Sequence, residues 1–86
     1  MAKTWPSDED VRASWGLRIR RRRRELELTQ AELGAQVGVV TTAVSAWEHG
    51  LSIPTPVRQA LIARALQCNP VELFPHPVPE EDGPDA

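Results

Sequence analysis

The sequence predicts an all-α domain built from five helices. Three observations support this fold class. Residues that favour helix starts recur along the chain and are followed by acidic residues or proline; apolar residues recur at helical spacing; and Gly38 and Gly50 stand where two short helices end. With 86 residues, 41% of them hydrophobic, the chain has room for one small core and therefore for one domain.

The first helix is predicted from about Asp8 to Glu27. Ser7 can cap it, and the acidic residues 8–10 suit the positive end of the helix dipole. Gly16 lies inside this segment, where we expect it to weaken the helix. One apolar face runs along the helix and is formed by Val11, Trp15, Ile19 and Leu26.

Two short helices are predicted next, at about 30–37 and 41–48. The Thr29 hydroxyl can cap the first of them, and Glu32 can return a bond to the Thr29 amide. Gly38 follows as a C′ residue, where a positive φ is easy for glycine. The apolar residues that we expect to face inward are Leu33, Val37, Val44 and Trp47.

The last two helices begin with the same device, a capping residue followed by proline. Thr55-Pro56 opens the fourth helix and Asn69-Pro70 opens a short fifth helix over 70–74. Residues 1–7 are predicted to be a flexible arm. Residues 75–86 contain four prolines, four acidic residues and no periodicity, so we expect a disordered tail after the domain of residues 8–74. In the fourth helix the apolar residues with helical spacing are Val57, Ala60, Leu61, Ala65 and Leu66.

The charge of the chain is divided between its middle and its ends. The net charge is −2, but residues 11–74 carry nine arginines against five glutamates, whereas residues 1–10 and 75–86 are acidic. Acidic flanks weaken non-specific attraction to nucleic acid. For the tail we favour simple solubilisation over autoinhibition.

Several function classes are excluded or disfavoured. No apolar run approaches the ~20 residues of a membrane span, and no signal peptide opens the chain. The single Cys68 forbids an internal disulfide, which suits a reducing cytoplasm. His49, His76 and Cys68 share no metal-ligand spacing, so we expect no metal, no cofactor and no enzymatic activity.

Residues 15–74 resemble the Cro and lambda-repressor type of helix-turn-helix domain, often called the XRE family. This resemblance rests on the spacing of many residues taken together. The matching residues are Ile19, Arg23, Leu28-Thr29-Gln30, Glu32-Leu33, Gly38-Val39, Val44, Trp47-Glu48, Gly50, Pro54, Ala65-Leu66 and Val71-Glu72-Leu73. The resemblance implies a lambda-repressor-like fold with the helix-turn-helix at about 30–48, which presents one helix to the major groove of DNA.

The resemblance also implies which residues read bases. By position they are Val40, Thr41, Thr42, Ser45 and Ala46. Helix 41–48 contains no arginine, lysine, asparagine or glutamine, so it offers no bidentate base contact, and we expect readout of thymine methyl groups or DNA shape. Val40 is a poor capping residue, so Thr41 is an alternative cap and would then be less available to a base. The alternative for the two threonines is plain exposed helix surface.

Two further sets of residues follow from the resemblance. Gln30, at the start of the second helix, corresponds to a phosphate contact, the alternative being an ordinary exposed residue. Arg23 corresponds to an arginine that pairs with the glutamate ending the third helix, here Glu48. Arg22 stands where the family usually has leucine, so either its stem lies along the core or the first helix is rotated. The remaining arginines of the run are candidates for phosphate, an acidic partner or solvent: Arg20, Arg21 and Arg24.

The three tryptophans have different expected places. Trp47 is predicted to be core. Trp15 either packs on the bundle or lies half-exposed in a dimer interface with Val11. Trp5 either packs as a staple on the first helix or is disordered.

These inferences together predict a sequence-specific regulator that binds double-stranded DNA, a small repressor of bacterial or phage origin that acts as a homodimer in the cytoplasm, at the nucleoid. The usage of arginine, alanine and tryptophan favours a GC-rich actinobacterial host or its phage. The alternative is a protein-interaction module on the same fold, such as an antitoxin or a phage protein that binds a host factor.

Overall fold

The computed structural model describes residues 7–75, and all the regular structure in that range is helical. The arm before Ser7, including Trp5, and the tail from His76 onward lie outside the described residues. No helix within residues 7–75 is both long and apolar enough to cross a membrane. The helices are α1 (Asp8–Glu25), α2 (Gln30–Val37), α3 (Thr41–Glu48), α4 (Pro56–Ala65) and α5 (Pro70–Leu73).

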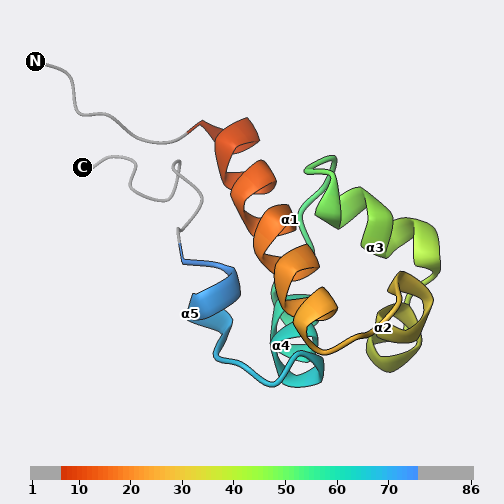
Figure 1. Cartoon of the computed structure of the whole chain (residues 1–86). Helices are drawn as coiled ribbons and strands as arrows, with labels where there is room; N and C mark the ends of the chain where they lie inside the picture. The colour runs from red at the N-terminus through yellow and green to blue at the C-terminus, as the bar shows by residue number, and fades with distance from the viewer. Residues whose placement is uncertain (1–6, 76–86) are drawn as a thin grey trace, which may run out of the picture.

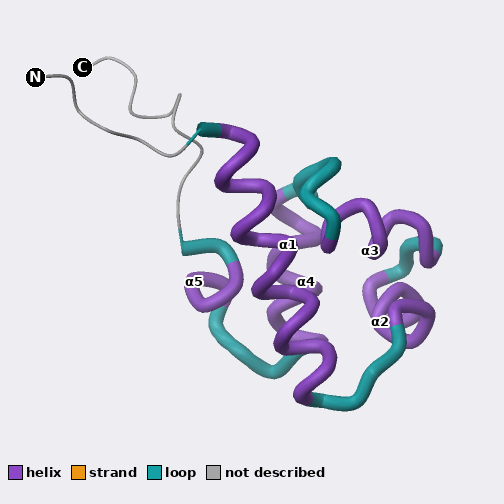
Figure 2. The backbone as a smooth tube through the Cα atoms, turned by 45° about the horizontal axis from the view of Figure 1, so that its top comes forward, coloured by secondary structure: helices purple, strands orange, loops and turns teal. Residues whose placement is uncertain are grey.

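The long helix α1 forms the spine of the molecule. It lies between α5 on one side and the α2–α3 pair on the other, with α4 behind it (Figure 1). The turned view keeps the same arrangement (Figure 2). α1 packs chiefly against α3, α2 bridges α3 and α4, and α5 rests on α4 and α1. The two short helices of the predicted motif are therefore held from both sides.

The ends of the helices agree closely with the sequence, with corrections at the ends of α1 and α5. This helix ends at Glu25 rather than Glu27, because Glu27 adopts a left-handed conformation (φ 59°) that closes the helix, with the Leu28 amide bonded to the Arg23 carbonyl at 3.0 Å. The turn carries Leu28 onto the core and leaves Thr29 to cap α2. α5 likewise ends one residue early, at Leu73.

Capping follows the predicted chemistry at three helices. The Asp10 amide donates to Ser7 Oγ at 3.0 Å, and the Arg58 amide donates to Thr55 Oγ1 at 3.3 Å. At α2 both halves of the capping box form. α3 and α5 are different, because their N-cap residues, Val40 and Asn69, provide no side-chain bond, so Asn69 does not cap α5 with its side chain as predicted. Thr41 is the first helical residue and does not take over as the cap.

One core joins α1 to the four shorter helices. The predicted inward residues Leu33, Val37, Val44 and Trp47 are all buried there. In α4 and its C-cap the packed face is formed by Ile62, Ala63 and Leu66. Val57, Ala60 and Leu61, which the apolar spacing also singled out, are exposed. The buried residues of this core cluster are Ile19, Leu33, Val37, Val44, Trp47, Ile62, Ala63, Leu66 and Leu73.

The first half of α1 is also buried on one side. Trp15 packs edge-on against Phe74, with 4.9 Å between ring centroids, and its side chain is almost inaccessible. Val11 is buried as well. The half-exposed dimer interface offered as one place for these two residues is therefore wrong, and packing on the bundle is confirmed. Arg12 Nε donates to the Gly50 carbonyl at 3.2 Å and ties α1 to the turn after α3.

Gly16 has a packing function that the sequence did not indicate. A Cβ atom at this position would lie 2.3 Å from the Trp47 carbonyl oxygen and 2.7 Å from that of Glu48. These are backbone atoms at the end of α3, which cannot move aside alone. The expectation that Gly16 merely weakens α1 is therefore incomplete, because glycine allows α1 and α3 to approach this closely.

The substitution Gly16→Ala tests the close approach of α1 and α3. Two effects of opposite sign compete in this variant. Helix propensity alone would stabilise the variant by about 1 kcal/mol. The backbone overlap should outweigh that gain and lower the free energy of unfolding by about 2 kcal/mol, measured by urea unfolding with tryptophan fluorescence. Leu17→Ala, at the exposed neighbouring position, is the control and should change stability by less than about 0.5 kcal/mol. A Gly16→Ala chain as stable as the parent would contradict the packing seen here.

Candidate nucleic-acid interface

A buried ion pair fixes the end of α3 to α1. Arg23 Nε lies 2.6 Å from Glu48 Oε2, and a second guanidinium nitrogen of Arg23 lies 2.9 Å from Glu48 Oε1, so the contact is bidentate. A third donor of Arg23 reaches the Leu28 carbonyl at 2.8 Å. Only 10% and 2% of the two side chains are exposed. The Arg23–Glu48 pairing predicted by resemblance is present in the structure.

Gln30 completes this network from α2. Its Nε2 donates to Glu48 Oε1 at 3.0 Å, so the side chain is half-buried rather than simply exposed at the helix start. Glu48 thus accepts from α1 and α2 at once. The network sets the positions of the first turn of α2 and the last turn of α3 relative to α1, although these residues are far apart in sequence.

The network also sets the ionisation of its members. Burial opposes ionisation of Glu48, but hydrogen bonds from Arg23 and Gln30, helped by the charges of Arg23 and Arg20, outweigh it and hold the pKa of Glu48 below its usual value. The hydrogen bond to Glu48 raises the pKa of Arg23. Both groups are therefore charged at neutral pH, as the bidentate geometry requires.

The five residues predicted to read bases lie together on α3 and its cap. Thr41 and Thr42 are exposed, Val40 is 69% exposed, and Ser45 and Ala46 are half-buried one turn further on. Because Thr41 is not used as a cap, its hydroxyl and methyl groups face solvent together with those of Thr42. Gly34, in α2, allows the turn between α2 and α3 to pack closely on α2, since a Cβ there would lie 2.8 Å from the Val39 carbonyl oxygen.

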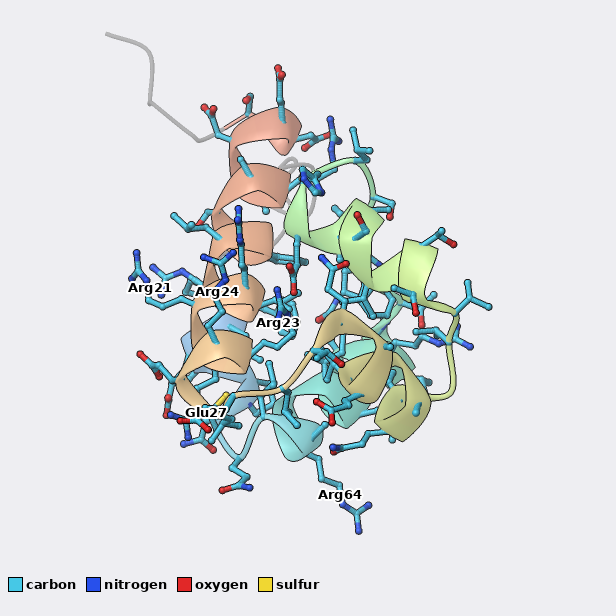
Figure 3. The ribbon with its side chains drawn as sticks, turned by 45° about the vertical axis from the view of Figure 1, so that its right-hand side comes forward. Arg21, Arg23, Arg24, Glu27 and Arg64 are labelled. Carbon is cyan, nitrogen blue, oxygen red and sulfur yellow. The ribbon has the colours of Figure 1, made fainter. Side chains whose placement is uncertain are left out.

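The five consecutive arginines divide into three groups. Arg23 points toward α2 and α3, whereas Arg21 projects from the other side of α1 (Figure 3). Arg20, Arg21 and Arg24 are exposed. Arg22 is half-buried: its Nε donates to the Leu66 carbonyl at 2.8 Å, and another nitrogen donates to the Gln67 carbonyl at 3.3 Å.

Arg22 therefore has a structural role that could not be predicted from the sequence. Its guanidinium satisfies carbonyl groups at the C-terminal end of α4, where no intrahelical donor is available. α1 is not rotated, since Ile19 and Arg23 keep their expected inward positions. Only a three-dimensional view could reveal this contact, because Arg22 and Leu66 are 44 residues apart.

Two of the residues considered for other chemistry, His49 and Cys68, lie within the described range. Within residues 7–75, no three histidine, cysteine, aspartate or glutamate side chains lie close enough together to hold a metal ion. His49 Nδ1 lies 2.8 Å from the Ser45 carbonyl oxygen, at the end of α3. Burial and the Glu72 carboxylate raise the pKa of the Cys68 thiol, against a smaller opposing effect of Arg22.

The arrangement of α2 and α3 identifies the family. A helix-turn-helix family matches residues 19–73, which include both helices and the Arg23–Glu48 pair. The chain belongs to this helix-turn-helix family. The match also covers α4 and α5, so membership rests on the whole bundle behind the motif.

Two curated proteins resemble this helix-turn-helix chain over 55 residues, 64% of its length. Repressor protein C2 of Salmonella phage P22 is 44% identical and the transcriptional regulator DicA of Escherichia coli is 40% identical. The chain spans only 26% and 41% of the length of these two relatives.

Solved structures agree with the sequence relatives. The P22 c2 repressor, in a complex with a synthetic operator, superposes with a TM-score of 0.68 at 42% identity, covering 70% of this chain and 91% of that one. The restriction-modification controller protein C.AhdI of Aeromonas hydrophila gives a TM-score of 0.70 at 30% identity, covering 73% and 96%. The lambda-repressor-like fold predicted from the sequence is confirmed.

Replacing Glu48 by glutamine tests the buried pair. The variant keeps the size of the side chain but leaves the Arg23 charge without its partner, so we expect a loss of about 3 kcal/mol in the free energy of unfolding at pH 7. Because the pKa of Glu48 is lowered in the folded state, its stabilising effect is present above the unfolded pKa of about 4.5 and is lost as pH falls through the folded pKa. The difference between parent and variant should therefore shrink below that range.

Urea unfolding at pH 7 and at several pH values below 4.5 measures this effect. Glu25→Gln is the matched control, since Glu25 pairs with Arg22 at 3.1 Å but is 54% exposed and should contribute under about 0.5 kcal/mol. An equal loss in both variants at pH 7, or a Glu48→Gln difference independent of pH, would show that the buried pair does not act as described.

Proposed function

We propose that this chain binds double-stranded DNA sequence-selectively and acts as a transcriptional regulator, a small repressor of bacterial or phage origin. The observation that carries the proposal is the exposed surface of α3 around Thr41 and Thr42, held in a helix-turn-helix by the Arg23–Glu48–Gln30 network. A helix is about 10–12 Å wide with its side chains, which suits the ~12 Å major groove. The related P22 c2 repressor is itself seen with a synthetic operator.

Base readout is assigned to the start of α3. The hydroxyl groups of Thr41 and Thr42 can donate or accept hydrogen bonds, and their methyl groups can contact thymine. Val40 and Ala46 add apolar contacts, and Ser45 adds a hydroxyl. With no bidentate side chain on the helix, discrimination comes from thymine methyl groups and from the shape of the DNA.

Phosphate contacts are assigned to the surroundings of α3. The N-terminal turn of α2 offers backbone amides and a positive dipole end beside Gln30. Since Nε2 of Gln30 is already bonded to Glu48, this residue also positions the turn that meets the phosphate. The exposed Arg20, Arg21 and Arg24 supply positive potential on α1, and at least one of them is proposed to contact a phosphate.

A homodimer is proposed as the DNA-bound form. Two copies reading half-sites one helical turn apart (~34 Å) would double the contacts of a small domain. Exposed apolar residues that a second copy would cover are present on α4 and α5: Val57 is 71% exposed, Leu61 37% and Val71 63%. The proposed place of action is the cytoplasm, at the nucleoid.

The double substitution Thr41→Ala with Thr42→Ala tests the reading surface. Fluorescence anisotropy would measure affinity for a duplex enriched by the parent chain and for a scrambled duplex of the same composition. We expect the preference for the enriched duplex to fall about tenfold or more, because the variant loses base contacts. Affinity for the scrambled duplex and its salt dependence should stay unchanged, because no phosphate contact is removed.

Gln36→Ala is the matched control, since Gln36 is exposed on α2 beside Leu61 and Arg64 of α4. Thermal unfolding must give the same midpoint for all three chains. If the threonine variant kept its full preference, α3 would not be the reading helix. If no duplex were bound at all, the protein-interaction alternative would replace the proposal.

A further inference from the structure

An arginine patch lies on the outer side of α1, away from the core. We use this name for Leu17, Arg20, Arg21 and Arg24, which line one shallow depression. Leu17 is 53% exposed, and the three arginines are exposed as well. Within residues 7–75, no ion pair or side-chain hydrogen bond engages these three guanidinium groups, in contrast to Arg22 and Arg23.

The patch is continuous with the place where the described chain ends. Arg21 also lines a second depression, between α1 and α5, together with Arg18, Glu72 and Leu73. Arg18 joins the two helices directly, because one of its nitrogens donates to the Glu72 carbonyl at 3.2 Å. Pro75, the last described residue, is only two positions beyond Leu73. Phe74 packs on Trp15, so the chain leaves the bundle beside Trp15, just before the arginine patch along α1.

The segment that follows has complementary chemistry. Residues 76–86 read HPVPEEDGPDA, an apolar Pro-Val-Pro followed by Glu80, Glu81 and Asp82, with Asp85 further on. The apolar Pro-Val-Pro of this segment can contact Leu17, and the acidic residues that follow it can pair with the arginines that follow Leu17 on α1. Proline-rich chains are already extended, so less entropy is lost when such a segment docks.

We infer that the acidic tail, residues 76–86, docks on the arginine patch of the same molecule. The tail is long enough. From Pro75 to Glu80 an extended proline-rich chain spans about 16 Å, and Asp82 lies about 6 Å further. Along α1, Arg21 lies about 9 Å and Arg24 about 13.5 Å beyond Trp15, where the described chain ends. The four carboxylates of the tail thus meet the three arginines without rearrangement of the bundle.

Each contact in the docked state is weak, but the tail is covalently joined to the domain, and this connection strengthens docking. An exposed ion pair contributes about 0–1 kcal/mol, but a short linker holds the tail at an effective concentration in the millimolar range. Docking is therefore strongest at low salt and is released by high salt or by a denser anionic surface. The tail, which the sequence predicts to be solubilising, would then also compete with other anions for the arginines.

The consequence for DNA rests on the proposed function, whereas the docking itself does not. A docked tail would cancel the positive potential of α1 and make the chain bind weakly to DNA in general. Only a duplex that also offers favourable contacts to α3 would displace it. The tail would then raise discrimination between specific and non-specific DNA.

Side-chain NMR of the full chain tests the docking. The Nε–Hε resonances of the arginines would be compared between the parent and a variant with a neutral tail, Glu80→Gln, Glu81→Gln, Asp82→Asn and Asp85→Asn. At about 20 mM salt we expect the Arg21 and Arg24 resonances to differ between the two chains. At about 0.5 M salt, where the screening length is under about 5 Å, the difference should vanish.

Arg64 is the internal control, because it is exposed on α4 and lies apart from the arginine patch (Figure 3). Its resonance should be the same in both chains. Unchanged Arg21 and Arg24 resonances at low salt would overturn the inference. So would an equal change at Arg64, since it would show a general effect of net charge rather than docking.

A second measurement addresses DNA. With a random 20-base-pair duplex at about 50 mM salt, neutralising the tail should strengthen binding about three- to tenfold. In a chain that also carries Arg21→Gln and Arg24→Gln, the same tail change should give less than twofold, because the two sites are coupled. Equal gains in both backgrounds would contradict competition at the patch. If no chain bound DNA, the proposed function would fail while the NMR result still decided the docking.

Discussion

The structure depends on one buried charge pair. Arg23 and Glu48 bond in bidentate fashion, and Gln30 adds a third contact from a different helix. An isolated charge in this position would be strongly unfavourable, so each partner requires the other. Gly16 makes the arrangement possible, because its missing side chain allows the backbone of α1 to approach the end of α3. The surface of α3 can be presented rigidly because its buried end is fixed in this way.

Much of this could be predicted from the sequence, because the signals are local. The capping box at Thr29 and the prolines at Pro56 and Pro70 place three helix starts correctly. The end of α1 was less predictable, since Glu27 adopts a positive φ that glycine or asparagine usually signals. The exposed position of Val57 could not be predicted either, because its spacing fits the apolar pattern of α4 although its side chain faces outward.

The contacts of the five consecutive arginines could be predicted only in part from the sequence. Periodicity alone indicates that five consecutive residues surround a helix, and resemblance assigns Arg23 to Glu48. The contact of Arg22 with the carbonyl of Leu66 depends on where α4 ends in space, which no local pattern encodes. The double use of Gln30, positioning α3 while lying beside the amides of α2, is also a three-dimensional property. The remaining arginines lie on α1, apart from α3, so the proposed attraction to phosphate and the proposed readout of bases reside on different elements.

Reading of DNA sequence by the exposed face of α3 is tested most directly by selecting bound fragments from random duplex DNA at near-physiological salt. We expect an enriched sequence with two-fold symmetry, whose half-sites lie one helical turn apart and are rich in thymine at the contacted positions. Absence of enrichment, with only weak binding that disappears as salt is raised, would rule out reading by α3 and favour a protein as the partner of this surface.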